Sequence, residues 1–156
     1  MKSAYNHEWV YNLALIKEAK RWSKHKFISA EQFSAISGTY KTPFYHPNMI
    51  IRILLFMATL LAISGVTGLL AMMIVDAGVI AICIGCIVYG LGSLAVLEKL
   101  FIANNHFKSG VTEALLYHAC GFIIGGIGGL SEFDNIQVVL IACLVVFAFA
   151  GWRYLD

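Results

Sequence analysis

The feature that most constrains this chain is an uncharged run, residues 53–75, which follows a polar and aromatic N-terminal segment. At about 1.5 Å of rise per residue, a helix of this length extends roughly 34 Å. That is enough to cross a membrane hydrocarbon core of about 30 Å. We therefore expect a membrane-spanning helix here.

The composition agrees with a membrane protein. The chain is 60% hydrophobic and 13% charged, with a mean hydropathy of +0.78, whereas roughly a quarter of the residues in a soluble domain are charged. The formal charge of +2 is too small to indicate a nucleic-acid partner. Because the first long apolar run begins only after about fifty residues, we expect no cleavable signal peptide.

The segment before this run is predicted to form a helical hairpin, residues 1–46. Residues 5–26 are moderately amphipathic and become rich in Lys and Arg toward their end. Ser29 and Gln32 have the spacing of a capping box, which predicts a second short helix from Ala30 to about Gly38.

The rest of the chain is predicted to cross the membrane four times. A continuous helix over residues 53–97 would be roughly 68 Å long, about twice the bilayer, so the chain has to turn near residues 76–78. The predicted fold is all-α, with a transmembrane domain over residues 47–156 and spans at about 50–75, 77–97, 112–130 and 136–152.

The distribution of cations predicts the orientation of these spans. All 11 Lys and Arg residues lie on one side of the four-span arrangement, and the loops on the other side contain Asp76, Glu132 and Asp134 without any cation. An excess of Lys and Arg marks the cytoplasmic side. We expect both termini in the cytoplasm.

A short motif resembles a known family. Residues 27–32 read Phe-Ile-Ser-Ala-Glu-Gln after a basic helix end, and Arg52 enters a first span that contains Gly65 and Gly68. Over about residues 13–71 this pattern resembles the bacterial predicted membrane proteins grouped as domain of unknown function 2157. The resemblance implies a multi-span inner-membrane protein with a cytoplasmic N-terminal hairpin, and it implies no activity or site residues. Many members have more spans, so the chain is either a short relative or part of a longer protein.

His118 is the one ionisable side chain well inside a predicted span, about a turn and a half from the end of that span. Ionisable groups inside a membrane are costly and by default suggest a function. With Tyr117 beside it and Glu113 upstream, His118 is a candidate for a proton relay. However, His118 and Glu113 are five residues apart and do not share a helix face. A neutral, structural imidazole is the alternative, and the spacing favours it.

Two further patterns lie within the spans. Cys83 and Cys86 have the C-x-x-C spacing of redox and metal sites, but an apolar helix favours the neutral thiol, so we interpret them as packing residues and expect no metal or other cofactor. Gly121, Gly125 and Gly129 form overlapping small-xxx-small repeats, which allow two helices to approach closely in lipid. This ridge could pack within the chain, join two copies, or form a sliding contact in a transporter.

The sequence therefore supports a first hypothesis of a non-enzymatic membrane protein. Its partners would be the lipid bilayer and either a second copy or another membrane protein, with the hairpin docking on a partner or on the membrane surface. The alternative is a small-solute or proton-coupled transporter, or a subunit of one, that uses His118, Tyr117 and Glu113. A thiol redox enzyme based on Cys83 and Cys86 is the least favoured hypothesis.

Overall fold

The computed structural model describes residues 4–131 and 135–154, and within them it contains six α-helices, as the predicted all-α fold requires. The chain divides into two compact units, one up to Phe44 and one from Tyr45 onward.

The N-terminal unit is the predicted helical hairpin. Its helices are α1 (His7–Lys24) and α2 (Ala30–Thr39). The predicted capping box at the start of α2 is confirmed: Ser29 Oγ accepts from the Gln32 N–H at 3.1 Å, and Gln32 Oε1 accepts from the Ser29 N–H at 2.8 Å. These two bonds satisfy backbone donors that the first helical turn leaves without partners.

The hairpin buries few of its side chains. Ala19 is the one buried residue in α1, and α2 has none. An aromatic contact supports the hairpin, because the Phe44 ring packs edge-on against Tyr5 and Trp9 at 6.0 and 5.7 Å between ring centroids. Phe27 is 78% exposed in the turn between the helices. The hairpin therefore keeps apolar surface that could contact something else.

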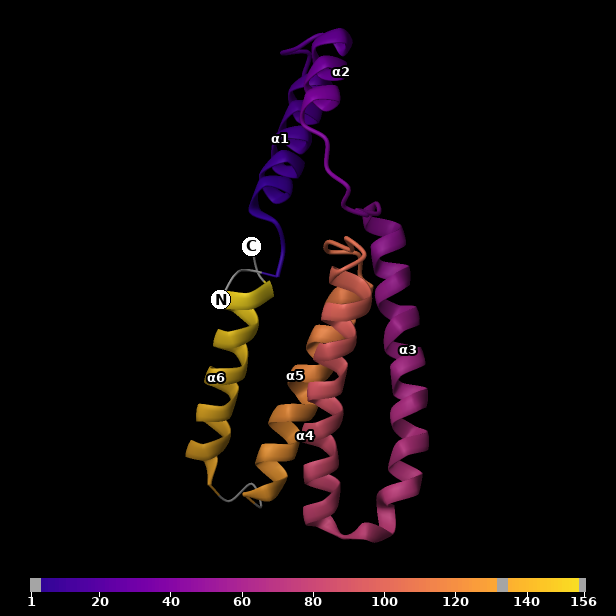
Figure 1. Cartoon of the computed structure of the whole chain (residues 1–156), viewed down its shortest axis with the longest axis vertical. Helices are drawn as coiled ribbons and strands as arrows, with labels where there is room; N and C mark the ends of the chain where they lie inside the picture. The colour runs from indigo at the N-terminus through magenta and orange to yellow at the C-terminus, as the bar shows by residue number, and fades with distance from the viewer. Residues whose placement is uncertain (1–3, 132–134, 155–156) are drawn as a thin grey trace. The chain divides into compact units, whose positions relative to one another are not determined.

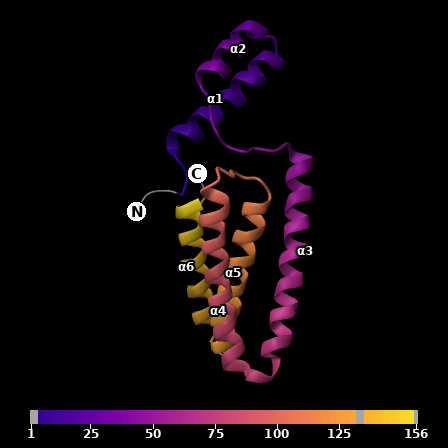
Figure 2. The same cartoon turned by 45° about the vertical axis from the view of Figure 1, so that its right-hand side comes forward.

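Among the described residues, the second unit contains four helices that are long and apolar enough to cross a membrane, and this confirms the predicted number of candidate spans. The helices run alternately up and down (Figures 1 and 2). Their bounds are α3 (Met49–Ile74), followed by the short 3₁₀ helix η1 (Val75–Ala77), then α4 (Val79–Val96), continued by the π-helix η2 (Leu97–Ile102), α5 (Val111–Leu130) and α6 (Ile136–Tyr154). Such a set of helices indicates an integral membrane protein.

The two ends of this bundle differ in charge. We call the end where α3 and α5 begin the basic end, because it contains the cations Arg52, Lys99, Lys108 and Arg153. We call the other the far end. The predicted turn near residues 76–78 lies there, where Gly78 has a φ of 84° that a side chain would disfavour.

The second span is longer than its sequence predicts. Glu98 and Lys99 do not end it, because η2 continues the helix to Ile102. The physical reason is that the Glu98 carboxylate has partners on α6: it accepts from Arg153 Nε at 3.0 Å and from the Tyr154 hydroxyl at 2.9 Å. A carboxylate paired in this way can remain on a helix near the membrane boundary.

The loop between α4 and α5 is joined to the chain that enters α3. The Tyr45 N–H donates to the Asn105 carbonyl at 2.9 Å, and the Phe107 N–H donates to the Tyr45 carbonyl at 3.4 Å. The Tyr45 and His106 rings pack 5.1 Å apart. These contacts hold the first turns of α3 and α5 next to each other at the basic end.

The tightest packing in the unit is between α4 and α5, which lie side by side in both views (Figures 1 and 2). An added Cβ on Gly90 would lie 2.7 Å from Ile123 Cγ1 and 2.9 Å from the Ala119 carbonyl oxygen, and one on Gly126 would lie 2.6 Å from the Cys83 carbonyl oxygen. Small residues permit this close approach. Eight residues of α5 are buried and none of α3, so α5 is the central helix.

Replacing Gly90 with leucine is expected to destabilise the protein by about 1–3 kcal/mol, because the new side chain would overlap Ile123 and the Ala119 carbonyl. Gly92→Leu is the matched control, since Gly92 lies on the same helix and has no such neighbour within 4 Å. A thiol-reactive dye that labels the buried Cys83 and Cys120 on unfolding would measure both melting temperatures in detergent. Equal melting temperatures would contradict this packing.

Candidate functional site

An ion pair joins α3 to α5 at the basic end. Arg52 Nη2 donates to Glu113 Oε1, and the side chains of Arg52 and Glu113 are 41% and 19% exposed. Glu113 is a candidate from the sequence alone, but its pairing with Arg52 is not predicted there. The pair is predictable in hindsight, since both residues lie in the first turn of a span that begins at the same end.

The second oxygen of Glu113 fixes the start of α5. Glu113 Oε2 accepts from the Gly110 N–H at 2.8 Å and from the Thr112 hydroxyl at 3.0 Å. Gly110 has a φ of 93°, and a Cβ there would collide with the Arg52 carbonyl oxygen. Glycine is therefore needed at this position both for the backbone conformation and for the close approach of α3.

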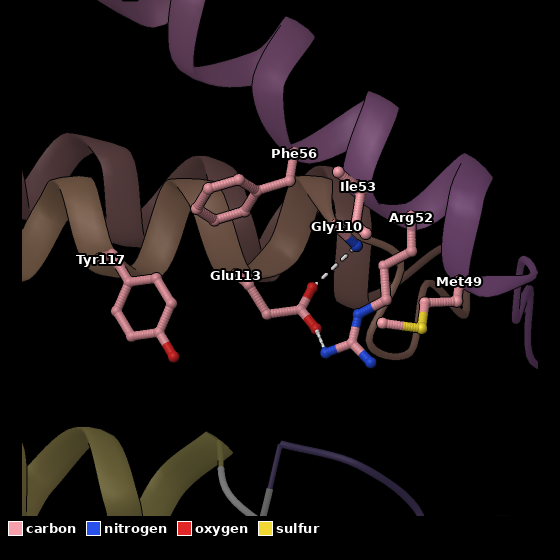
Figure 3. Close-up of a pocket in the computed structure, with 7 residues that line it drawn as sticks. All are labelled: Met49, Arg52, Ile53, Phe56, Gly110, Glu113 and Tyr117. Atoms are coloured by element: carbon pink, nitrogen blue, oxygen red, sulfur yellow. Dashed lines mark hydrogen bonds and ion pairs between the residues drawn. The ribbon is translucent and has the colours of Figure 1, made fainter.

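A groove of about 270 Å³ opens at this ion pair (Figure 3). We call it the Arg52–Glu113 groove. Figure 3 shows the guanidinium of Arg52, the carboxylate of Glu113 and the hydroxyl of Tyr117 extending toward the same side. Tyr117 is 61% exposed, and its ring packs edge-on against Phe56 at 6.5 Å. The residues that line the groove are Met49, Arg52, Ile53, Phe56, Gly110, Glu113 and Tyr117.

His118 belongs to a different group of side chains. Its Nε2 lies 3.3 Å from Thr67 Oγ1, which also lies 3.0 Å from the Tyr89 hydroxyl oxygen and 2.8 Å from the Ile63 carbonyl oxygen. The imidazole packs against the Tyr89 and Phe122 rings, with centroids 5.6 and 4.6 Å away. We call Thr67, Tyr89 and His118 the polar trio. It joins α3, α4 and α5 and does not include Glu113 or Tyr117.

A proton count indicates how the polar trio is bonded. The Thr67 hydroxyl has one proton and two lone pairs, and the Ile63 carbonyl can only accept. If Thr67 donates to Ile63, its lone pairs can accept from the Tyr89 hydroxyl and from a protonated His118 Nε2. This arrangement satisfies all three contacts at once and requires a proton on His118 Nε2.

The polar trio lies deep in the span region. Tyr89 is about 15 Å along the helix from Val79, and Thr67 is about 15 Å before Ala77. His118 is only about 10 Å from the start of α5, as its sequence position implies, but its partners place it near the middle of the other two spans. Grooves of about 370 and 390 Å³ lie on either side of Tyr89.

Thr67 and Tyr89 are not predicted as site residues from the sequence. Both are uncharged residues in apolar runs, and neither carries a motif that distinguishes it from an ordinary membrane-facing residue. Of the three residues in the polar trio, only His118 is predicted as a candidate from the sequence. The partners of that histidine depend on helix tilt and rotation, which a single sequence does not specify.

One part of the predicted glycine ridge packs on another helix of this chain, and the other part is exposed. A Cβ on Gly129 would meet the Cys83 sulfur at 2.5 Å, so Gly129 packs on α4. Gly121 and Gly125 have no such neighbouring atom within 4 Å. Part of the ridge is therefore used within the chain, and the Gly121–Gly125 part is open.

The cysteines lie in surroundings that suit packing residues. All four are free, Cys83 and Cys120 are buried, and Cys83 lies against Gly129. Within residues 4–131 and 135–154, no group of three or more His, Cys, Asp or Glu side chains is placed to hold a metal ion.

No family model matches the sequence, and neither a curated protein nor a solved structure matches it significantly. The resemblance of residues 27–32 and of the first span to domain of unknown function 2157 therefore stays a prediction. Any functional proposal has to rest on the side chains described above.

Replacing Thr67 with valine is expected to destabilise the protein by about 1–3 kcal/mol, because it removes the hydroxyl that both the Tyr89 hydroxyl and His118 Nε2 contact. Thr59→Val is the matched control: Thr59 makes the same bond to the carbonyl four residues earlier, at 2.7 Å to Leu55. Urea or thermal unfolding in detergent compares the two. If Thr59→Val lost as much stability as Thr67→Val, the contacts of the polar trio would add nothing to the stability of the protein.

Proposed function

We propose that this chain is a non-enzymatic multi-pass membrane protein that assembles in the bilayer through the open Gly121–Gly125 face of α5. One observation carries the proposal. The central helix uses Gly126 and Gly129 to pack on α4, while Gly121 and Gly125 have open space where a second helix could approach. In lipid, such small-xxx-small faces favour helix–helix association.

The orientation of the chain follows from its charges. Lys and Arg residues gather on the N-terminal hairpin and at the basic end of the spans. The positive-inside rule then puts both termini in the cytoplasm, and the family resemblance implies the bacterial inner membrane. The partly exposed apolar side chains of the hairpin, among which Phe27 is 78% exposed, suit a surface that docks on a partner or on lipid headgroups.

Replacing both Gly121 and Gly125 with leucine is expected to reduce the oligomeric fraction at least fivefold, which corresponds to about 1 kcal/mol of association free energy. Crosslinking in native membranes followed by mass analysis measures that fraction. The matched control is the double replacement Gly65→Leu and Gly68→Leu on α3, because these glycines are also open.

Two results would contradict the assembly proposal. One is a chain that is monomeric in the membrane at all expression levels. The other is an oligomer that both double variants leave unchanged. A stable complex with a different membrane protein that only the α5 variant disrupts would support the interface and identify the chain as a subunit.

A second candidate function is proton-coupled transport of a small solute, which the polar trio favours. An ionisable side chain within a span is expensive to maintain and often marks an ion pathway. His118 contacts the Thr67 hydroxyl, which also contacts the Tyr89 hydroxyl, and Tyr89 lines both grooves. A redox function is less favoured, because Cys83 is covered by Gly129.

Under the transport hypothesis, His118→Ala is expected to lower proton flux into proteoliposomes at least tenfold, because an imidazole is the one side chain type in the polar trio that ordinarily exchanges a proton near neutral pH. A pH-sensitive dye trapped inside the vesicles measures the flux, and Thr59→Val provides the control for a generally weakened bundle. Equal flux in the wild type and His118→Ala would remove His118 from any mechanism.

A further inference from the structure

The Arg52–Glu113 groove has the position of a lipid headgroup site. Arg52 is about one turn into α3, and Glu113 lies in the first turn of α5. Both spans begin at the basic end, so the groove lies where a membrane boundary would cross the bundle. Aromatic and cationic side chains at this depth typically contact headgroups.

The ion pair has hydrogen-bonding capacity left over. The contact described between Arg52 and Glu113 uses Nη2 of a guanidinium that has five N–H donors. The Arg52 side chain is 41% exposed, so other donors can reach a ligand in the groove. Glu113 Oε1 also faces the groove, where a carboxylate oxygen can accept more than one hydrogen bond.

The charges of the groove define what it would hold. Arg52 and Glu113 together are neutral, so a purely anionic headgroup gains less there than it would beside an unpaired cation. A headgroup with a phosphate and an ammonium matches both partners. The phosphate would accept from Arg52, and the ammonium would donate to Glu113 and to the exposed Tyr117 hydroxyl. A primary ammonium fits better than a trimethylated one, because it has N–H donors that both of these oxygen atoms can accept.

The size and walls of the groove agree with this ligand. Its volume of about 270 Å³ is below the roughly 300–1,000 Å³ of pockets for drug-sized molecules, which suits a small headgroup whose chains lie outside. Ile53, Phe56 and Met49 provide apolar walls for the glycerol region. We propose that the Arg52–Glu113 groove binds the headgroup of a zwitterionic aminophospholipid of the phosphatidylethanolamine type. This proposal does not depend on the assembly through Gly121 and Gly125.

The test is a lipid titration of the purified full chain in detergent, followed by native mass spectrometry. The probes are phosphatidylethanolamine, phosphatidylcholine and phosphatidylglycerol with identical acyl chains. We expect the first bound phosphatidylethanolamine to be held at least fivefold more tightly than either other lipid. Equal binding of the three, or a preference for phosphatidylglycerol, would overturn the proposal without any variant.

Variants then assign the preference to the groove. Glu113→Gln keeps an acceptor for the Gly110 N–H but removes the charge, so it should abolish the preference over phosphatidylcholine. Arg52→Gln should weaken binding of both zwitterionic lipids at least fivefold. Arg153→Gln is the control, because Arg153 is paired with Glu98 at the same end of the bundle. An equal effect of Arg153→Gln would overturn the assignment.

A soluble competitor separates the two sources of this headgroup chemistry. Free phosphoethanolamine lacks the chains that would contact the apolar walls, so we expect it to displace the lipid only at concentrations at least tenfold higher. Displacement at the same concentration as the lipid would identify a soluble metabolite as the ligand instead.

Discussion

The rest of the membrane unit depends on the close approach of α4 and α5 at Gly90 and Gly126. In lipid there is little hydrophobic force between helices, so their association relies on van der Waals contact and interhelical hydrogen bonds. Glycine brings the two backbones near enough for Ile123 and Ala119 to pack directly on α4. This contact makes α5 the most buried helix and provides the surface on which α3 and α6 are positioned.

The outer helices are attached by polar contacts as well as by packing. Arg52 of α3 pairs with Glu113 of α5, and Arg153 of α6 pairs with Glu98 near the end of the second span. Both ion pairs lie at the basic end, where water or headgroups can screen the charges. Deeper in the bundle, α3 is joined to α4 and α5 through the Thr67 hydroxyl, an uncharged group that contacts both Tyr89 and His118. The chain thus uses ion pairs near the boundary and neutral hydrogen bonds near the middle.

Much of this fold is predictable from the sequence, and most of the candidate site is not. The uncharged run at residues 53–75, the turn near residues 76–78 and the Ser29–Gln32 capping box each follow from a pattern within a short stretch of sequence, and the structure agrees with all three. The predicted end of the second span at residue 97 is wrong, because the partners of Glu98 lie on α6 and are distant in sequence. The members of the polar trio and of the Arg52–Glu113 pair are likewise distant from one another in sequence. Their members become neighbours only through the rotation and tilt of separate helices.

One face of α5 connects the two proposals for this protein. Glu113, Tyr117, Gly121 and Gly125 follow one another at intervals of four residues, so they form one stripe along the helix. The stripe begins with a charged pair at the membrane boundary, continues with an exposed aromatic ring and ends in open glycines. A helix that packed on Gly121 and Gly125 would therefore pass beside Tyr117, at the edge of the Arg52–Glu113 groove. A lipid headgroup in that groove would then contact the partner helix as well, so lipid binding and assembly would each change the affinity of the other by the same factor.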